Sequence, residues 1–361
     1  INETNAFADY IVPDAFFYEA WGMGTAWAVP TKLTTARWPV VEPAQAKLAD
    51  GTPISMETFF IAVAKRLGLP GFGDNAIPDA GGQLHALNRA EDYHLRGAVN
   101  LAYAGKPVPD AADEDIELSG VARIAPALRA VLKDDEWRKA AFIYSRGGRF
   151  QARDETYTGE RLSNRFKGVL QIYNETLGTA RNTLTGQRHI GTATWIPPVF
   201  ADGTPVAAVY PEAQWPFKLV SYKSVLQNSY SLGARRLTEI HPTNPVAVNE
   251  EDAARLGIRP GDAIRLTTPG GTAVGTALVC SGVRKGVLAI EHGFGHRELG
   301  ARRHWIGGKQ QSSVPGLRAG VNLNDLGFAD PRRSGLSTLG DWVIGTAARQ
   351  ALPARIERVQ A

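Results

Sequence analysis

The stretch HPTNPVAVNEEDAARLGIRPGDAIRLTTPGG, residues 241–271, decides the fold of the C-terminal part of this chain. Its apolar run at 246–248 indicates a strand, and Asn249 is a preferred N-cap for a short helix that Gly257 ends. A Pro-Gly-Asp turn leads into a second apolar run at 263–267, which the hairpin-forming tripeptide Pro-Gly-Gly follows. The stretch therefore predicts a strand, one helical segment and the first strand of a hairpin.

Further strands are predicted on both sides of this stretch. Residues 218–221 precede it, residues 272–280 return from the hairpin, and residues 287–291 follow another glycine-containing turn. Several short strands with one inserted helical turn are typical of a small closed barrel. The C-terminal part is therefore expected to be an all-β barrel.

The first part of the chain has a different pattern. Residues 57–67 carry apolar side chains near helical spacing, and residues 8–13 form a short apolar run that ends at a proline. Residues 145–215 are rich in Gly, Thr, Asn and Pro, which is typical of loops. We expect two domains: 1–214, the end of an α/β region with helical and loop insertions, and 215–361, the barrel.

Composition and charge restrict the possible ligands. The chain is 43% hydrophobic and 21% charged, as an ordinary globular protein is. Residues 211–361 contain 19 Lys and Arg against 12 Asp and Glu, whereas the remaining residues contain 21 against 24. A basic part without a long basic run favours a small polyanion in a cleft over nucleic acid. The single cysteine, Cys280, cannot build an iron–sulfur or zinc site.

Three stretches carry a resemblance to a known family. The 241–271 stretch looks like the signature of the C-terminal domain of the molybdopterin (dimethyl sulfoxide reductase-type) oxidoreductases. NETNAFADYIVPDAFFYEAWG at 2–22 resembles part of their third domain, and AGVNLNDLG at 319–327 resembles their GxNxN segment. All three occur in family order. Within the family, 226–246 and 291–309 look most like the branch that reduces tetrathionate, with the arsenate reductases as near neighbours.

The resemblance implies a fold, cofactors and partners. The fold would be the end of the third, dinucleotide-binding α/β domain followed by a six-stranded double-psi β-barrel. The cofactor would be molybdenum held by two molybdopterin guanine dinucleotides, with the metal ligand and a 4Fe–4S cluster supplied by an N-terminal part outside this sequence. Expected partners are that N-terminal part, a membrane anchor protein and an iron–sulfur electron-transfer subunit, with a periplasmic location. This segment alone is expected to be inactive.

Three polar segments are candidates for holding such a cofactor. A long anion with diphosphates and hydrogen-bonding ring edges requires backbone N–H groups, amides and a few cations. No catalytic residue and no metal ligand is predicted within the chain. The candidate cofactor-binding residues are Lys223, Gln227, Asn228 and Ser229 after the 218–221 strand, His292, Gly295 and His296 after the 287–291 strand, and Asn322 and Asn324 in the tail.

Each segment also has a purely structural interpretation. Lys223 is a cation for a phosphate, but the turn around it could simply satisfy its own backbone. His292 and His296 flank a glycine-rich loop rather than lie on a helix face, so we interpret them as hydrogen-bonding groups rather than metal ligands. Asn322 and Asn324 would face one side of a strand and contact a pterin edge, or else they cap a loop.

The three segments are expected to meet at one end of the barrel in a polar concave surface. None is needed for the apolar core, so a shared ligand is the expected reason for their convergence. Two rival functions remain open at this point. One is a stand-alone barrel that binds a substrate or partner without redox chemistry, because fold does not fix function. The other is a related reductase of arsenate or another oxyanion.

Overall fold

The structure is a computed structural model of the 361-residue chain. It describes residues 3–26, 29–163, 172–182, 186–195, 197–200, 202–227, 234–298, 300–327, 330 and 349–359. The chain divides into two compact units: Ile1–Asp9 with Gln171–Ala361, and Tyr10–Leu170. This division differs from the expected boundary at 214/215, because Phe200 and Val206 pack into the core of the barrel. We call the two units the barrel unit and the helical unit.

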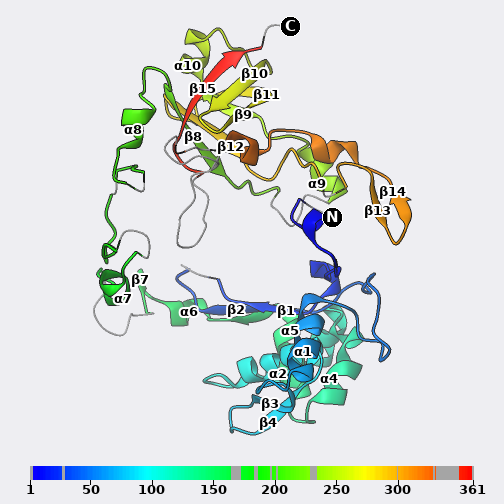
Figure 1. Ribbon diagram of the computed structural model, residues 1–361. Helices are drawn as coiled ribbons and strands as arrows, with labels where there is room; N and C mark the ends of the chain where they lie inside the picture. The colour runs from blue at the N-terminus through cyan, green and yellow to red at the C-terminus, as the bar shows by residue number, and fades with distance from the viewer. Residues whose placement is uncertain are drawn as a thin grey trace. The chain divides into compact units, whose positions relative to one another are not determined.

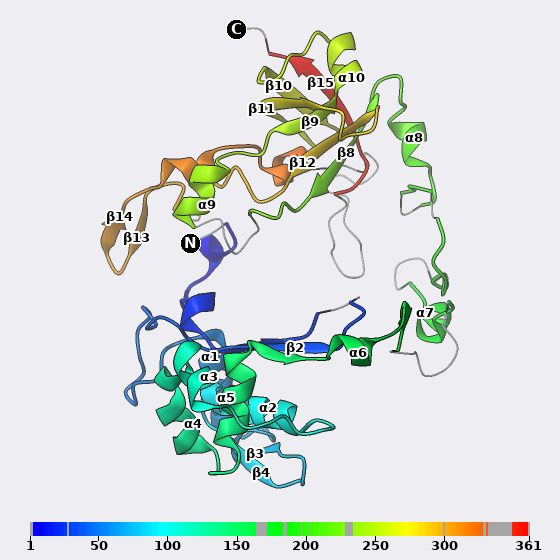
Figure 2. The ribbon, with the colours of Figure 1, turned by 180° about the vertical axis from the view of Figure 1, so that it is seen from behind.

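The barrel unit contains a closed six-stranded barrel, drawn in Figures 1 and 2. Its strand order is β10-β11-β9-β12-β8-β15, where β11 with β9 and β12 with β8 are parallel and the other pairs are antiparallel. The closed six-stranded barrel is thus confirmed. The strands are β8 (Phe217–Tyr222), β9 (Val246–Asn249), β10 (Ala263–Thr268), β11 (Gly271–Cys280), β12 (Val287–Glu291) and β15 (Leu352–Arg358).

Local sequence signals account for this barrel. Helix α10 (Glu250–Arg255) begins at Asn249, whose side chain accepts a hydrogen bond from the backbone N–H of Glu251, as predicted. Strands β10 and β11 form the predicted hairpin. Apolar side chains at alternate strand positions point inward, and the core residues with at most 1% exposure include Phe217, Leu219, Ile264, Leu266, Leu288 and Ile290.

The remaining elements of the barrel unit are short. The apolar run at residues 8–13, which spans the division between the two units, contains no regular element and is exposed. Asn322 and Asn324 do not lie on a strand either, because η5 begins there. The short elements of the barrel unit are η1 (Asn5–Phe7), α7 (Glu175–Thr179), α8 (Val206–Val209), α9 (Arg235–Ile240), β13 (His304–Ile306), β14 (Lys309–Gln311), η4 (Pro315–Arg318) and η5 (Leu323–Leu326).

The helical unit packs α2 (Ala90–Tyr103) against α5 (Trp137–Ser145) around a core that includes Leu95, Val99 and Ile143. The predicted helix is α1 (Met56–Arg66), and its N-cap Ser55 accepts a hydrogen bond from Thr58. The other helices are η2 (Phe17–Glu19), α3 (Asp113–Leu118), η3 (Val121–Arg123), α4 (Ala125–Val131) and α6 (Arg153–Thr156). None of the helices in the described residues is long and apolar enough to cross a membrane.

Short antiparallel sheets complete the helical unit. β1 (Gly22–Gly24), β2 (Leu33–Arg37) and β5 (Gly148–Phe150) form one sheet, and two hairpins form the others. The hairpins are β3 (Gly73–Pro78) with β4 (Leu84–Leu87), and β6 (Tyr157–Thr158) with β7 (Arg161–Leu162).

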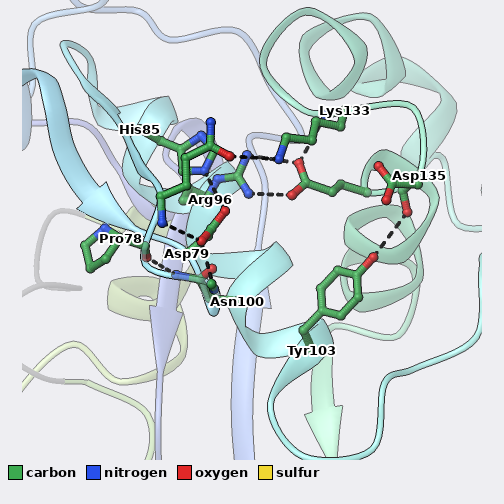
Figure 3. Close-up of polar contacts among 11 residues, drawn as sticks. Pro78, Asp79, His85, Arg96, Asn100, Tyr103, Lys133 and Asp135 are labelled. Carbon is green, nitrogen blue, oxygen red and sulfur yellow. Dashed lines mark hydrogen bonds and ion pairs between the residues drawn. The ribbon is translucent and has the colours of Figure 1, made fainter.

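A buried ion pair connects α2 to the start of α5. The guanidinium of Arg96 donates two hydrogen bonds to the carboxylate of Glu136, at 2.8 and 3.0 Å (Figure 3). Arg96 is 2% exposed and Glu136 is 6% exposed. A bidentate pair of this kind fixes both position and orientation, so it determines how the two helices approach each other.

Candidate functional site

One end of the barrel brings the predicted segments together. Strands β8 and β12 are parallel neighbours, and Tyr222 is paired with Glu291 at their last residues. The backbone N–H of His292 donates to the carbonyl of Tyr222 at 3.1 Å. The loop that begins at Lys223 and the loop that begins at His292 therefore leave the barrel side by side.

Asn244 joins the third segment to this end. Its side-chain amide donates to the carbonyls of Glu291 at 2.6 Å and Val321 at 3.0 Å, and its Oδ1 accepts from the backbone N–H of Val321 at 2.7 Å. The residue is 1% exposed. Convergence of the three segments is confirmed, but the chain's own hydrogen bonds hold them, so a shared ligand is not needed to explain it.

Gly295 and Asn322 form part of this framework. Gly295 has a φ of +68°, and a Cβ there would lie 2.5 Å from the backbone nitrogen of Asn322. Asn322 donates from Nδ2 to the carbonyl of Gly295 at 3.2 Å and accepts from the N–H of Asn324 at 3.0 Å as the N-cap of η5. The loop-capping interpretation is thus the one observed for Asn322. The side chain of Asn324 is exposed and accepts from Arg349 at 3.0 Å.

In the segment after β8, one candidate residue is exposed and another is buried. Lys223 is exposed. Gln227 is 2% exposed, and its Nε2 donates to the carbonyl of His241 at 2.7 Å, so this side chain holds its loop in place. Asn228 and Ser229 lie outside the described residues.

His296 has a hydrogen-bond partner, Glu3, that lies far from it in the sequence. Its Nδ1 lies 3.1 Å from a carboxylate oxygen of Glu3, and its Nε2 lies 3.0 Å from the carbonyl of Gly293. Glu3 also accepts from the backbone N–H of Arg297 at 2.7 Å. Burial raises the pKa of Glu3, but the hydrogen bonds from Arg297 and His296 outweigh it and bring the pKa from 4.5 to about 2.

We expect acid to release residues 3–7 from the loop at His296. The pKa of Glu3 is depressed, so its contribution is complete above the ordinary value of 4.5 and is lost as the pH falls through about 2. Hydrogen exchange at the N–H of Arg297 should therefore accelerate, relative to its intrinsic rate, below pH 4.5. In Glu3→Gln the protection should be weaker at neutral pH and should not change over this range. Equal protection in the two proteins at neutral pH would contradict the assignment.

His241, Asn244 and Glu291 belong to the site although sequence analysis did not select them. His241 Nε2 lies 2.6 Å from Oε2 of Glu291, and the imidazole stands edge-on to the ring of Phe294 at 5.4 Å. Glu291 is 2% exposed, and its Oε1 has no hydrogen-bond partner among the described residues. Glu291 is the last residue of β12 and Asn244 lies two residues before β9, and no other local sequence signal marks them.

Comparison with known proteins agrees with this geometry. Residues 218–334 match the molydopterin dinucleotide binding domain family. The chain is 52% identical to a tetrathionate reductase polypeptide of Salmonella typhimurium, across 99% of the chain and 35% of that protein. It is 28% identical to a selenate reductase polypeptide of Mesobacillus selenatarsenatis, across 99% of the chain and 36% of that protein.

A solved structure shows the same fold. Acetylene hydratase from Pelobacter acetylenicus matches 99% of this chain with a TM-score of 0.51 and 16% identity, over 39% of that protein. The chain spans 35% of the length of the tetrathionate reductase relative and 36% of the length of the selenate reductase relative.

Proposed function

Because this chain corresponds to the C-terminal part of a molybdopterin oxidoreductase, with a molydopterin dinucleotide-binding domain at residues 218–334, we propose that the barrel end described above holds the cofactor. The convergence of the loops after β8 and β12 with the 319–326 segment, all inside the matched region, carries this proposal. The net positive charge of residues 211–361 would offset the charge of a diphosphate.

The residues at this end fit the chemistry of such a group. Lys223 and Asn324 are exposed, so a cation and an amide are available to a ligand. The orphaned Oε1 of Glu291 is an acceptor for which the described chain offers no donor, whereas pterin and purine edges carry N–H groups. Gln227, Gly295 and Asn322 then position the loops rather than contact the ligand, since their polar groups bond to the chain itself.

The bound cofactor would supply the redox chemistry, and this chain would supply binding and orientation. Lys223 would pair with a phosphate, and Asn324, held by Arg349, would meet a ring edge or a phosphate oxygen. His292, half-buried at the strand end, would donate or accept a hydrogen bond beside them.

For the whole protein we propose reduction of tetrathionate to thiosulfate in anaerobic respiration. The identity of 52% along 99% of the chain supports this assignment. The proposal includes two guanine dinucleotides with molybdenum, a 4Fe–4S cluster in the N-terminal part, a membrane anchor, an iron–sulfur electron-transfer subunit, and a periplasmic location. The similarity to selenate reductase supports reduction of another oxyanion, such as arsenate, as the second candidate. Turnover of tetrathionate against selenate and arsenate by the whole protein, with a reduced viologen dye, decides between them.

Replacing Lys223 and Asn324 together by Ala should weaken cofactor retention in the whole protein by about a hundredfold or more, because it removes two charge-assisted hydrogen bonds of about 1.5–3 kcal/mol each. Pterin content after dialysis measures this effect. The exposed Lys309 on β14 is a matched control, and Lys309→Ala should retain the cofactor. Asn322 is left intact, because its replacement would remove the cap of η5. Full pterin retention by the double variant would refute the assignment of these two residues.

A further inference from the structure

The helical unit contains a cavity that lies outside the matched domain. Its volume is about 380 Å³, in the range of pockets for small organic molecules. Residues at the starts of α1 and α2 line it, together with the 39–53 loop and the 123–127 turn into α4. Figures 1 and 2 show α1, α2 and α4 in one group of helices. We propose that this cavity binds a small organic ammonium ion, held between Glu57 and His94.

His94 is the first observation that points to a ligand. It lines the cavity, is 7% exposed, and its Nδ1 has no hydrogen-bond partner among the described residues. A buried polar atom without a partner costs free energy, so a polar group of a ligand that reaches this nitrogen would be stabilised there. Burial lowers the pKa of His94, against an opposing effect of Glu57, so the ring is neutral at pH 7 and adds no positive charge.

The charges around the cavity favour a cation. Five acidic residues line it against three basic ones, and each basic residue is already engaged. Lys47 lies 3.9 Å from Glu42, Arg89 lies 3.6 Å from Glu91, and Arg123 donates to the carbonyl of Val40 at 2.9 Å.

Glu57 has no such partner. It is half-buried in the first turn of α1, and no ion pair or hydrogen bond to its carboxylate occurs within the described ranges. Its negative charge acts on His94, and both side chains line the cavity. A carboxylate and a neutral imidazole that line one cavity form a site for a group that carries both a positive charge and N–H donors.

The residues that line the cavity favour an organic ion over a metal ion. Trp21, Val41, Ile124 and Ala127 line the cavity and would pack against an alkyl chain. The described residues contain no group of three or more His, Cys, Asp or Glu that could hold a metal. The occupant is therefore an alkylammonium ion whose apolar part contacts this wall.

The test is a calorimetric titration of the protein with n-butylammonium, together with observation of the His94 ring signals by NMR. Saturable binding that shifts these signals is expected. Tetramethylammonium, which has the charge but no N–H donor, should bind at least about tenfold more weakly, since a charge-assisted hydrogen bond is lost. Butyrate, which has a similar size and the opposite charge, should not bind.

Two matched variants locate the counter-charge. Glu57→Gln should weaken n-butylammonium binding about tenfold or more, whereas Glu114→Gln, at an exposed position of α3, should leave it unchanged. Circular dichroism of both variants checks that they are folded. Absence of saturable binding to the unsubstituted protein, equal binding in Glu57→Gln, or tighter binding of butyrate would each overturn the proposal.

Discussion

Replacing Arg96 by Met should lower the free energy of unfolding of the helical unit by about 3–5 kcal/mol. The substitution removes the guanidinium of Arg96 and its two hydrogen bonds. The negative charge of the Glu136 carboxylate then stays in the interior without that cation to balance it. An uncompensated buried charge is far more costly than the loss of a surface ion pair. Urea denaturation followed by tryptophan fluorescence measures the change, because Trp137 lies at the start of α5.

Two further variants separate the buried charge from the packing. Arg66→Met makes the same substitution at an exposed position of α1 and should change stability by less than about 0.5 kcal/mol. Arg96→Met combined with Glu136→Leu removes both charges and should recover most of the loss. A single variant within about 1 kcal/mol of the unsubstituted protein, the size of a surface effect, would contradict the role assigned to the pair.

The same pair predicts a pH dependence. Burial raises the pKa of Glu136, but the hydrogen bonds from Arg96 outweigh this and lower it. Because the folded-state pKa is depressed, the stabilisation is complete above the ordinary pKa of 4.5 and is lost as the pH falls through the lowered value. The acid-induced loss of stability should be smaller in the double variant, which has no carboxylate there to protonate.

Replacing Asn244 by Ala should destabilise the barrel unit by about 3 kcal/mol or more, because it leaves three buried backbone groups without partners. These are the carbonyls of Glu291 and Val321 and the N–H of Val321. The two loops that Asn244 joins should separate, so the whole protein should also lose cofactor. Denaturant unfolding and pterin content are the two measurements.

Asn324→Ala is the matched control for Asn244→Ala. Its side chain is exposed and bonds only to Arg349 among the contacts described, so stability should change by less than about 1 kcal/mol. The proposed function nevertheless predicts a loss of cofactor in this variant. If Asn244→Ala unfolds at the same denaturant concentration as the unsubstituted protein, Asn244 does not hold the loops.

The strands and turns of the barrel could be predicted because their signals are local. Asn249 caps a helix whose first N–H groups lie within three residues of it, and Gly257 ends that helix with a φ of +65°. The 263–280 hairpin pairs residues that are neighbours across one tight turn. Alternating apolar side chains then determine which face of each strand is buried. The resemblance to the molybdopterin oxidoreductases rests on this same local pattern.

The sequence by itself thus determined the barrel strands other than β15, the cap at Asn249 and the resemblance to the molybdopterin oxidoreductases, but only the tertiary structure decided which polar residues support the loops. Asn244 bonds to residues 47 and 77 positions away, and His296 bonds to Glu3 across 293 positions. No local periodicity encodes such pairs, because hydrogen-bond partners distant in sequence are brought together only when the barrel closes. For the same reason Asn322 bonds to the carbonyl of Gly295, 27 positions away, and Phe200 and Val206, which lie before the expected domain boundary, pack into the core of the barrel.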